Sequence, residues 1–289
     1  MEVTLGGLSA QILNGLIVGM IYALMGLGLS VIVGLLNIPN FVQGNLFALG
    51  AYCLLSVIWF SQSFWLGLIL GPLMVFVVSV LIEIGFLRRL YTLGHDYVLL
   101  FTYALALMSQ ELIIIIWGPR GFSVLPPEIL AGSLDLGVMS YPKYNLFVMV
   151  FAGLSILAVW LFLERTRYGA IMRAGLEDPD MVSALGINIQ RVFTLGYGLG
   201  AYLGALAGAL NAPIRGLAPT LGLDILPIAF VVVALGGLGN LLGAIAAGLI
   251  IGVAQGLVTQ FWAQGSSIVI FAVMAAILLV RPQGLFGLR

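Results

Sequence analysis

Long apolar runs separated by short polar or glycine-rich breaks make up almost the whole chain. A helix needs about 20 apolar residues to cross a bilayer, so the runs predict an all-α polytopic membrane protein with about eight to nine transmembrane helices. One run, 225–235, is about half that length, and its sequence leaves open whether it crosses or re-enters the membrane. The runs are 12–36, 46–60, 65–87, 97–117, 144–163, 192–210, 225–235, 241–262 and 268–280.

Two breaks, near 37–45 and near 236–240, predict broken or re-entrant segments. Irregular backbone is tolerated at membrane depth only where it lines a cavity or is buried in protein, and paired interruptions in the two halves of a transporter mark its binding region. Both breaks contain Gly-Asn-Leu followed by Gly-Ala, although close helix packing through glycine explains this match equally well. The candidate solute-pathway residues are Asn37, Asn40, Gln43, Gly44, Asn45, Gly236, Gly237, Gly239 and Asn240.

The stretch 164–191 is the only long polar insertion that also carries a dense set of positive charges. Its first part, 164–176, predicts a helix that continues out of the preceding span. Asp178 as N-cap, Pro179 at the first helical position and Gly186 just past the end then predict a second helix of about two turns. So short a helix needs something to pack on, either this protein's own helix ends or a groove in a cytoplasmic subunit. Its apolar face consists of Met181, Val182 and Leu185.

Composition supports the membrane assignment. Hydrophobic residues make up 62% of the chain and charged residues 8%, and the mean hydropathy is +1.19, far above the values of soluble domains. The 289 residues leave little room beyond a single transmembrane domain, 1–289. The formal net charge is zero, so nothing indicates a nucleic-acid partner.

Basic residues predict the orientation, because short cytoplasmic loops are enriched in Lys and Arg. Eight arginines fall on loops of one parity and three basic residues on the other. This places the loop 164–191 and the C-terminus in the cytoplasm, and the N-terminus and the loops 118–143 and 211–224 outside. Both breaks then fall on one side, which argues against a simple inverted repeat unless one segment is re-entrant. The two groups are Arg88, Arg89, Arg165, Arg167, Arg173, Arg191, Arg281 and Arg289, against Arg120, Lys143 and Arg215.

Catalytic and energy-coupling motifs are not recognisable in the chain. A phosphate-binding P-loop needs a lysine followed by Ser or Thr, whereas the only lysine, Lys143, precedes Tyr144. The single histidine, His95, has no cluster of further metal-ligating residues. Glu83 lies within about two turns of Arg88 and is expected to reach water by snorkelling. We therefore expect no enzymatic activity, metal or cofactor in this chain.

A set of short motifs is spread along the chain. The motifs are Arg173-Ala174, Glu177-Asp178, Leu185-Gly186-Ile187-Asn188, Asn40-Phe41, Gly50-Ala51-Tyr52, Leu235-Gly236-Gly237-Leu238-Gly239, Gly243-Ala244 and Arg281-Pro282-Gln283-Gly284-Leu285-Phe286-Gly287. Those in the charged loop resemble the cytoplasmic loop of permease subunits of branched-chain amino acid ABC importers of the LivH type, and the likeness extends over essentially the whole chain. One departure is that Gln43-Gly44-Asn45 stands where the family has His-Gly-Glu.

The resemblance implies a permease in the bacterial inner membrane that imports branched-chain or related small neutral or zwitterionic amino acids. Such a permease pairs with a second, related permease, two cytoplasmic ATPase subunits and an extracytoplasmic solute-binding protein. The charged loop would then be the coupling helix that receives the motion of the ATPase. Its expected coupling residues are Arg173, Glu177, Asp178, Asp180, Met181, Val182 and Leu185.

Two alternatives remain open from the sequence. The broader family includes permeases similar to urea and short-chain amide transporters, and a neutral first break suits any small neutral or zwitterionic solute. The other alternative, from a different class, is a self-sufficient secondary transporter or channel. The shortage of ionisable residues in the spans favours the ATP-driven importer, because ion-coupled transporters usually keep such residues along their pathway.

Overall fold

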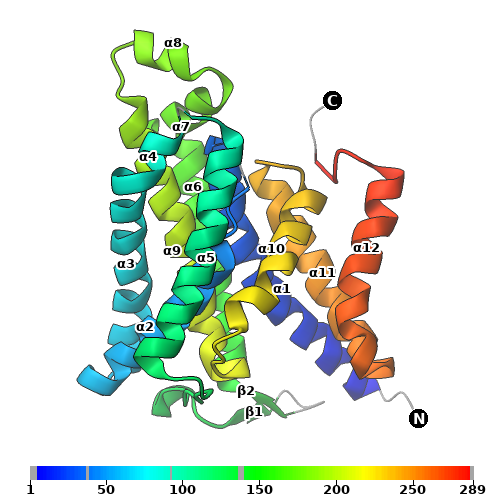
Figure 1. Cartoon of the computed structure of the whole chain (residues 1–289). Coiled ribbons are helices and arrows are strands. Elements are labelled where there is room, and N and C mark those ends of the chain that lie inside the picture. Colours follow the sequence, from blue (N-terminus) through cyan, green and yellow to red (C-terminus); the bar gives the residue numbers. More distant parts are fainter. Residues whose placement is uncertain (1–4, 37–38, 92, 136–139, 287–289) are drawn as a thin grey trace.

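The computed structural model describes residues 5–36, 39–91, 93–135 and 140–286, which form an almost entirely helical structure (Figure 1). Among these residues, seven helices are long and apolar enough to cross a membrane, and two shorter apolar helices accompany them. This confirms the predicted all-α polytopic architecture. The long helices are α1 (Leu5–Leu36), α2 (Gln43–Ser61), α3 (Phe64–Ile82), which continues through a π-helix (Glu83–Leu87) into α4 (Arg88–Leu90), α5 (His95–Trp117), α6 (Lys143–Arg165), α9 (Ile189–Arg215) and α11 (Leu241–Phe261), and the shorter ones are α10 (Leu221–Gly236) and α12 (Ser266–Val280).

The helices run between two faces of the molecule. The loop face carries α7 (Arg167–Glu177), α8 (Pro179–Ala184) and the end of α12 (Figure 1). The hairpin face carries two short antiparallel strands, β1 (Ser133–Asp135) and β2 (Ser140–Pro142), which the sequence did not predict. The two groups of basic residues separate between these faces as expected, with Arg88, Arg89, Arg165, Arg167, Arg173, Arg191 and Arg281 toward the loop face and Arg120, Lys143 and Arg215 toward the hairpin face.

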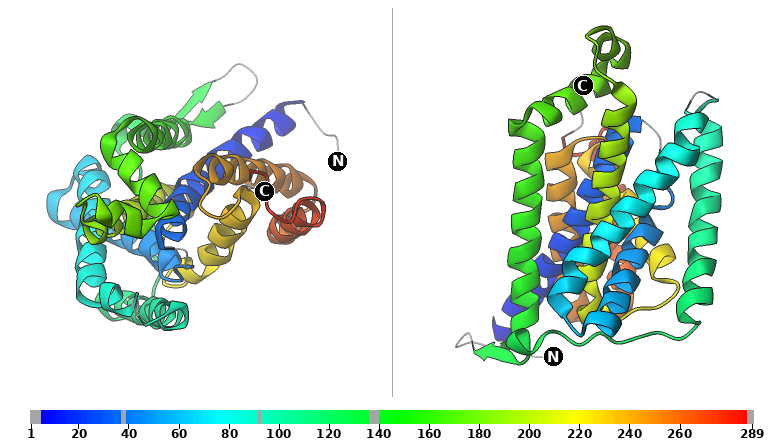
Figure 2. Two further views of the ribbon diagram at one scale, coloured as in Figure 1. Left: turned by 90° about the horizontal axis from the view of Figure 1, so that it is seen from above. Right: turned by 90° about the vertical axis from the view of Figure 1, so that its left-hand side faces the viewer.

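Two helices, α1 and α9, form the centre of the bundle. The most apolar window of α1 is 83% buried and that of α9 is 72% buried, against 22% for both α5 and α6. Seen from above, α5, α6 and α12 lie at the periphery (Figure 2). Large apolar side chains on these outer helices are therefore available to lipid or to another membrane subunit.

Glycines bring the central helices into direct backbone contact. A Cβ atom placed on Gly252 of α11 would lie 2.3 Å from the Cα of Gly19 in α1. One placed on Gly200 of α9 would lie 2.5 Å from the carbonyl oxygen of Gly28 in α1. Both distances are too short for any side chain, so α1 meets its two main partners through glycine, as small residues permit in helix packing within lipid.

The first break ends deep inside the bundle. α2 begins at Gln43, so the break is shorter than the predicted 37–45 segment, and Asn37 lies outside the described residues. The first turn of α2 is fully buried and packs against Gly28 of α1 and Gly204 in the middle part of α9. The chain therefore returns from the loop face into the bundle before the helix starts.

The segment 225–235 belongs to α10, which is shorter than the seven candidate membrane spans. Its first turn lies beside the first turn of α2, and the helix runs from there toward the loop face (Figure 1). The loop before it is shorter than the predicted 211–224, because α9 continues through Pro213 to Arg215. α9 passes through Pro213 although proline lacks the N–H group that would bond to the carbonyl oxygen of Ala209.

The Gly252→Leu variant tests the contact between α1 and α11. We expect it to lose about 1–3 kcal/mol of stability, since the added side chain would overlap the backbone of Gly19. The measurement is the thermal unfolding midpoint of the purified protein in detergent. Gly153→Leu on α6 is the matched control, because the nearest atom to its added Cβ is the Met20 Cε atom at 3.9 Å. Equal midpoints for the two variants would contradict the proposed role of this contact.

Candidate functional site

The first break and the start of α2 also contact α5 and α10. Phe41, in the break, packs against Tyr103 of α5 and Phe230 of α10, with ring centroids 6.0 Å and 5.3 Å apart. Gly44 lies so close to α10 that a Cβ atom there would be 2.1 Å from the Gly222 carbonyl oxygen. The first turns of α2 and α10 thus meet inside the bundle.

Amide side chains tie this turn to its neighbours. Gln43 Nε2 donates to the Gly200 carbonyl oxygen at 3.2 Å, and Asn45 Nδ2 donates to the Ala106 carbonyl oxygen of α5. The Gln43 Oε1 and Asn45 Oδ1 atoms accept no hydrogen bond from the described residues, although both side chains are buried. A buried acceptor without a donor is unfavourable by about 1–3 kcal/mol, so these two oxygens are available to a hydrogen-bond donor that enters the bundle.

The second break is built from backbone contacts at the loop face. Gly236 packs on Gly243 at the start of α11, and a Cβ atom on Gly284 would lie 2.8 Å from the Gly237 nitrogen. Asn240 caps α11, since its Oδ1 accepts from the Gly243 N–H at 2.9 Å, and its Nδ2 donates to the Phe286 carbonyl oxygen at 2.9 Å. This break therefore joins α10, α11 and the C-terminal segment.

The two breaks lie on either side of the last turns of α1. Gln43 of the first break contacts Gly28, and Gly239 of the second contacts Gly34. With a rise of about 1.5 Å per residue, these two points on α1 are about 9 Å apart along its axis. The two predicted pathway segments therefore contact the same stretch of α1, but at separate points.

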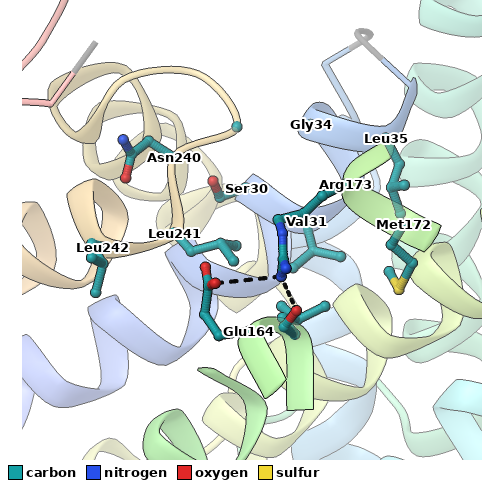
Figure 3. A pocket seen from close by; sticks show the side chains of 12 residues that line it. Ser30, Val31, Gly34, Leu35, Glu164, Met172, Arg173, Asn240, Leu241 and Leu242 are labelled. Carbon is teal, nitrogen blue, oxygen red and sulfur yellow. Dashed lines mark hydrogen bonds and ion pairs between the residues drawn. The ribbon is translucent and has the colours of Figure 1, made fainter. Parts of the chain in front are cut away.

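A cavity of about 300 Å³ opens beside the second break (Figure 3). An ion pair borders it, with Arg173 Nη1 3.5 Å from Glu164 Oε2, and the same nitrogen donates to the Leu163 carbonyl oxygen. The cavity joins the end of α1, the α6–α7 corner and the start of α11. Its lining residues are Ser30, Val31, Gly34, Leu35, Leu163, Glu164, Met172, Arg173, Gly239, Asn240, Leu241 and Leu242.

The charged loop forms a corner and not the continuous helix predicted for 164–176. α6 ends at Arg165, and Thr166 caps α7 by accepting from the Gly169 N–H at 3.2 Å. A Cβ atom on Gly169 would lie 2.0 Å from the Leu163 carbonyl oxygen, so the corner requires glycine there. Arg173, one of the predicted coupling residues, fastens α7 back to the end of α6 through Leu163.

The second predicted helix of the loop is present as α8. The Asp178 side chain accepts from the Met181 N–H at 2.9 Å, Pro179 is at the first turn, and Gly186 has a φ of +80°. Asp180 follows in the first turn and is exposed, and Glu177 is the last residue of α7. The capping chemistry of the sequence therefore correctly predicted both ends of this helix.

The apolar face of α8 is divided between two environments. Val182 is 3% exposed, because it packs on this chain's own helices. Met181 is 60% exposed and Leu185 is 73% exposed at the outermost point of the loop face (Figure 1). Val182 thus makes an inward contact, and the other two apolar side chains of this face are left on the surface.

Sequence reasoning missed a buried polar cluster next to the loop. Glu83 is 0% exposed, so the prediction that it snorkels to water is wrong. Its Oε2 atom accepts from the Thr194 hydroxyl at 2.6 Å and lies 3.6 Å from Arg88 Nη2, which donates to the same hydroxyl at 2.7 Å. The signal in the sequence was a carboxylate within a span, which is unfavourable there and rarely without a role.

Comparison with known proteins gives the family. The model of the branched-chain amino acid transport system permease component matches residues 11–278. The chain is 29% identical to the high-affinity branched-chain amino acid transport permease protein BraD of Pseudomonas aeruginosa, over 96% of this chain and 95% of that protein. It is 28% identical to LivH of Escherichia coli, over 96% and 94% of the two chains. It is also 27% identical to LivM of Escherichia coli, over 92% of this chain and 68% of that protein.

No solved structure matches the chain. The family model extends from within α1 to within α12 and includes the two breaks and the corner at α7 and α8. The matched relatives are named as transport permease proteins and not as enzymes. This multi-pass membrane protein belongs to the family of branched-chain amino acid transport permeases.

Proposed function

We propose that this chain is the permease subunit of an ATP-driven importer for branched-chain or related small neutral or zwitterionic amino acids. The observation that carries the proposal is the near full-length similarity to LivH and BraD, whose names assign them to branched-chain amino acid transport. Similarity to LivM supports a second, related permease as partner in forming the solute pathway. The peripheral helices with exposed apolar side chains offer surfaces on which such a partner would pack.

We place the loop face in the cytoplasm and the hairpin face outside the inner membrane. The support is the separation of basic residues between the two faces, since Lys and Arg are retained in short loops on the cytoplasmic side. The C-terminal segment then lies in the cytoplasm and the start of α1 lies outside. In this orientation, α8 faces ATPase subunits and the hairpin faces a solute-binding protein.

α8 is the proposed docking element for two cytoplasmic ATPase subunits. Met181 and Leu185 present apolar surface to the solvent, while the inward contact of Val182 holds the helix in place. Below α8, Arg173 ties α7 to the carbonyl group of Leu163. A force applied to α8 is therefore passed to the end of α6 through a short hydrogen-bonded connection.

The proposed solute pathway follows the last turns of α1, where the two breaks approach it. Gln43 and Asn45 supply neutral hydrogen-bonding groups in place of the ionisable residues that the family pattern has there. An amide-rich break also suits urea and short-chain amides, which keeps an importer of those solutes as the second candidate. A panel of amino acids, urea and amides tested for binding to the partner soluble protein decides between them.

Reconstitution tests the whole proposal. We expect solute uptake into proteoliposomes only when this chain is combined with the related permease, the ATPase subunits, the binding protein and ATP. The measurement is accumulation of radiolabelled leucine with and without each component. Gradient-driven solute flux through this chain alone would instead identify a self-sufficient secondary transporter or channel.

Leu185→Asp tests the docking surface. We expect solute-stimulated ATP hydrolysis of the assembled importer to fall by at least about tenfold, because a charge replaces an exposed apolar contact of the proposed interface. Leu125→Asp is the matched control, since Leu125 is 82% exposed but lies on the hairpin-face loop. Membrane insertion of both variants should equal that of the wild type. Unchanged stimulated hydrolysis in Leu185→Asp would remove α8 from the interface.

Gln43→Leu tests the first break. The variant keeps an uncharged side chain but removes the free Oε1 acceptor, so we expect the KM for uptake to rise several-fold. The thermal unfolding midpoint should fall only modestly, because one hydrogen bond to Gly200 contributes about 1 kcal/mol. A lowered midpoint with unchanged KM would show that Gln43 supports the fold and does not contact solute.

A further inference from the structure

The cavity beside the second break has walls of two chemical kinds. Apolar residues of α1, α6, α7 and α11 line it, including Leu35, Leu163 and Met172. The charged side chains of Glu164 and Arg173 lie among them (Figure 3). Its volume of about 300 Å³ lies at the lower end of the range for small-molecule sites, roughly 300–1,000 Å³.

The two charges can each receive a further partner. The side chains of Arg173 and Glu164 are 40% and 41% exposed, and their 3.5 Å separation is longer than a tight ion pair. Arg173 has five N–H donors and uses one nitrogen for Leu163 and Glu164, so other donors stay available to a carboxylate. Glu164 has acceptor sites left for an ammonium group.

Two further polar residues, Ser30 of α1 and Asn240 at the start of α11, also line the cavity. The hydroxyl group of Ser30 is buried and has no hydrogen-bond partner among the described residues. A positive group, a negative group and apolar walls therefore surround one small space.

We propose that this cavity binds a free zwitterionic amino acid with a branched apolar side chain at the loop face. The carboxylate of the ligand pairs with Arg173, its ammonium group pairs with Glu164, and its side chain packs on Leu35 and Met172. The placement of this cavity in the cytoplasm rests on the proposed function, which sets the orientation of the loop face. In that orientation the cavity is open to amino acid that has already been imported, and not to solute arriving from outside.

Occupancy of the cavity would act on the coupling loop. The ligand would bridge α7, which carries Arg173, to α1 and to the start of α11. It would add contacts that hold α7 in the position seen here, and a ligand stabilises whichever conformation it binds better. We therefore expect product to lower ATP hydrolysis from the loop face.

The first experiment measures binding to the permease–ATPase complex in nanodiscs, without the soluble binding protein. L-Leucine should bind, whereas N-acetyl-leucine, which lacks the ammonium group, and leucinamide, which lacks the carboxylate, should bind at least about tenfold more weakly. Phosphatidylethanolamine, a zwitterionic lipid, is present in one nanodisc preparation and absent from another. Leucine binding that is lost only with this lipid present would assign the cavity to the lipid and overturn the proposal.

Two variants locate the binding. Glu164→Gln should weaken leucine binding about tenfold, while Glu128→Gln on the hairpin face should leave it unchanged. Leu242→Trp should block the cavity without disturbing the core, because Leu242 is 54% exposed and lines the space. Leu238→Trp is its matched control, since Leu238 is exposed on the same face but outside this cavity.

The second experiment measures basal ATP hydrolysis of the same complex as leucine is added. We expect inhibition in the wild type and in Leu238→Trp, and none in Leu242→Trp. Leucine binding that is absent, or that is equal in the wild type, Glu164→Gln and Leu242→Trp, would overturn the proposed site. The proposed function is tested separately by the uptake experiment. Active uptake without leucine binding to this cavity would contradict only the proposed site. Leucine binding without uptake would contradict the proposed importer function.

Discussion

Backbone contact between α1 and its neighbours is the constraint on which the rest of the structure depends. Gly19 meets Gly252 of α11 and Gly28 meets Gly200 of α9, at separations that leave no space for a side chain. Apolar side chains gain little free energy when they move from lipid into a helix interface, so helix association in lipid depends on van der Waals contact between closely packed helices. α1 is therefore held between α9 and α11, and the positions of both breaks follow from it.

The central position of α1 explains why the two breaks, which are far apart in the sequence, both lie next to its last turns. The first break enters the bundle because α2 must start beside Gly28, and the second reaches Gly34 because α11 follows α1 closely. Unwound backbone is stable at such depth only when its polar groups are satisfied by protein or face a cavity. In the second break, the cap of Asn240 meets this requirement and the cavity borders the chain. In the first, Gln43 and Asn45 fasten the start of α2 to α9 and α5.

The sequence predicted features that depend on neighbouring residues and missed those that depend on tertiary contacts. Hydropathy predicted the spans, and local capping predicted α8, because both follow from residues a few positions apart. The depth at which α2 begins depends on helix contacts across the chain, and the division between Val182 and Leu185 depends on what α8 packs against. The burial of Glu83 is set by Thr194, which lies 111 positions further along the chain, so a single sequence carries no trace of that pairing.

The charged loop is fastened at both of its ends. At one end, Arg173 returns to the Leu163 carbonyl group of α6. At the other, Thr194 in the second turn of α9 bonds to Glu83 and Arg88, which tie α9 to the π-helix after α3. A buried carboxylate is unfavourable by several kcal/mol unless it is paired, so breaking this tie would leave an uncompensated charge and would be strongly resisted. In the proposed function, a displacement of α8 would therefore reach α6 and α9 together, and α9 would carry it to the start of α2 through Gly200 and Gln43.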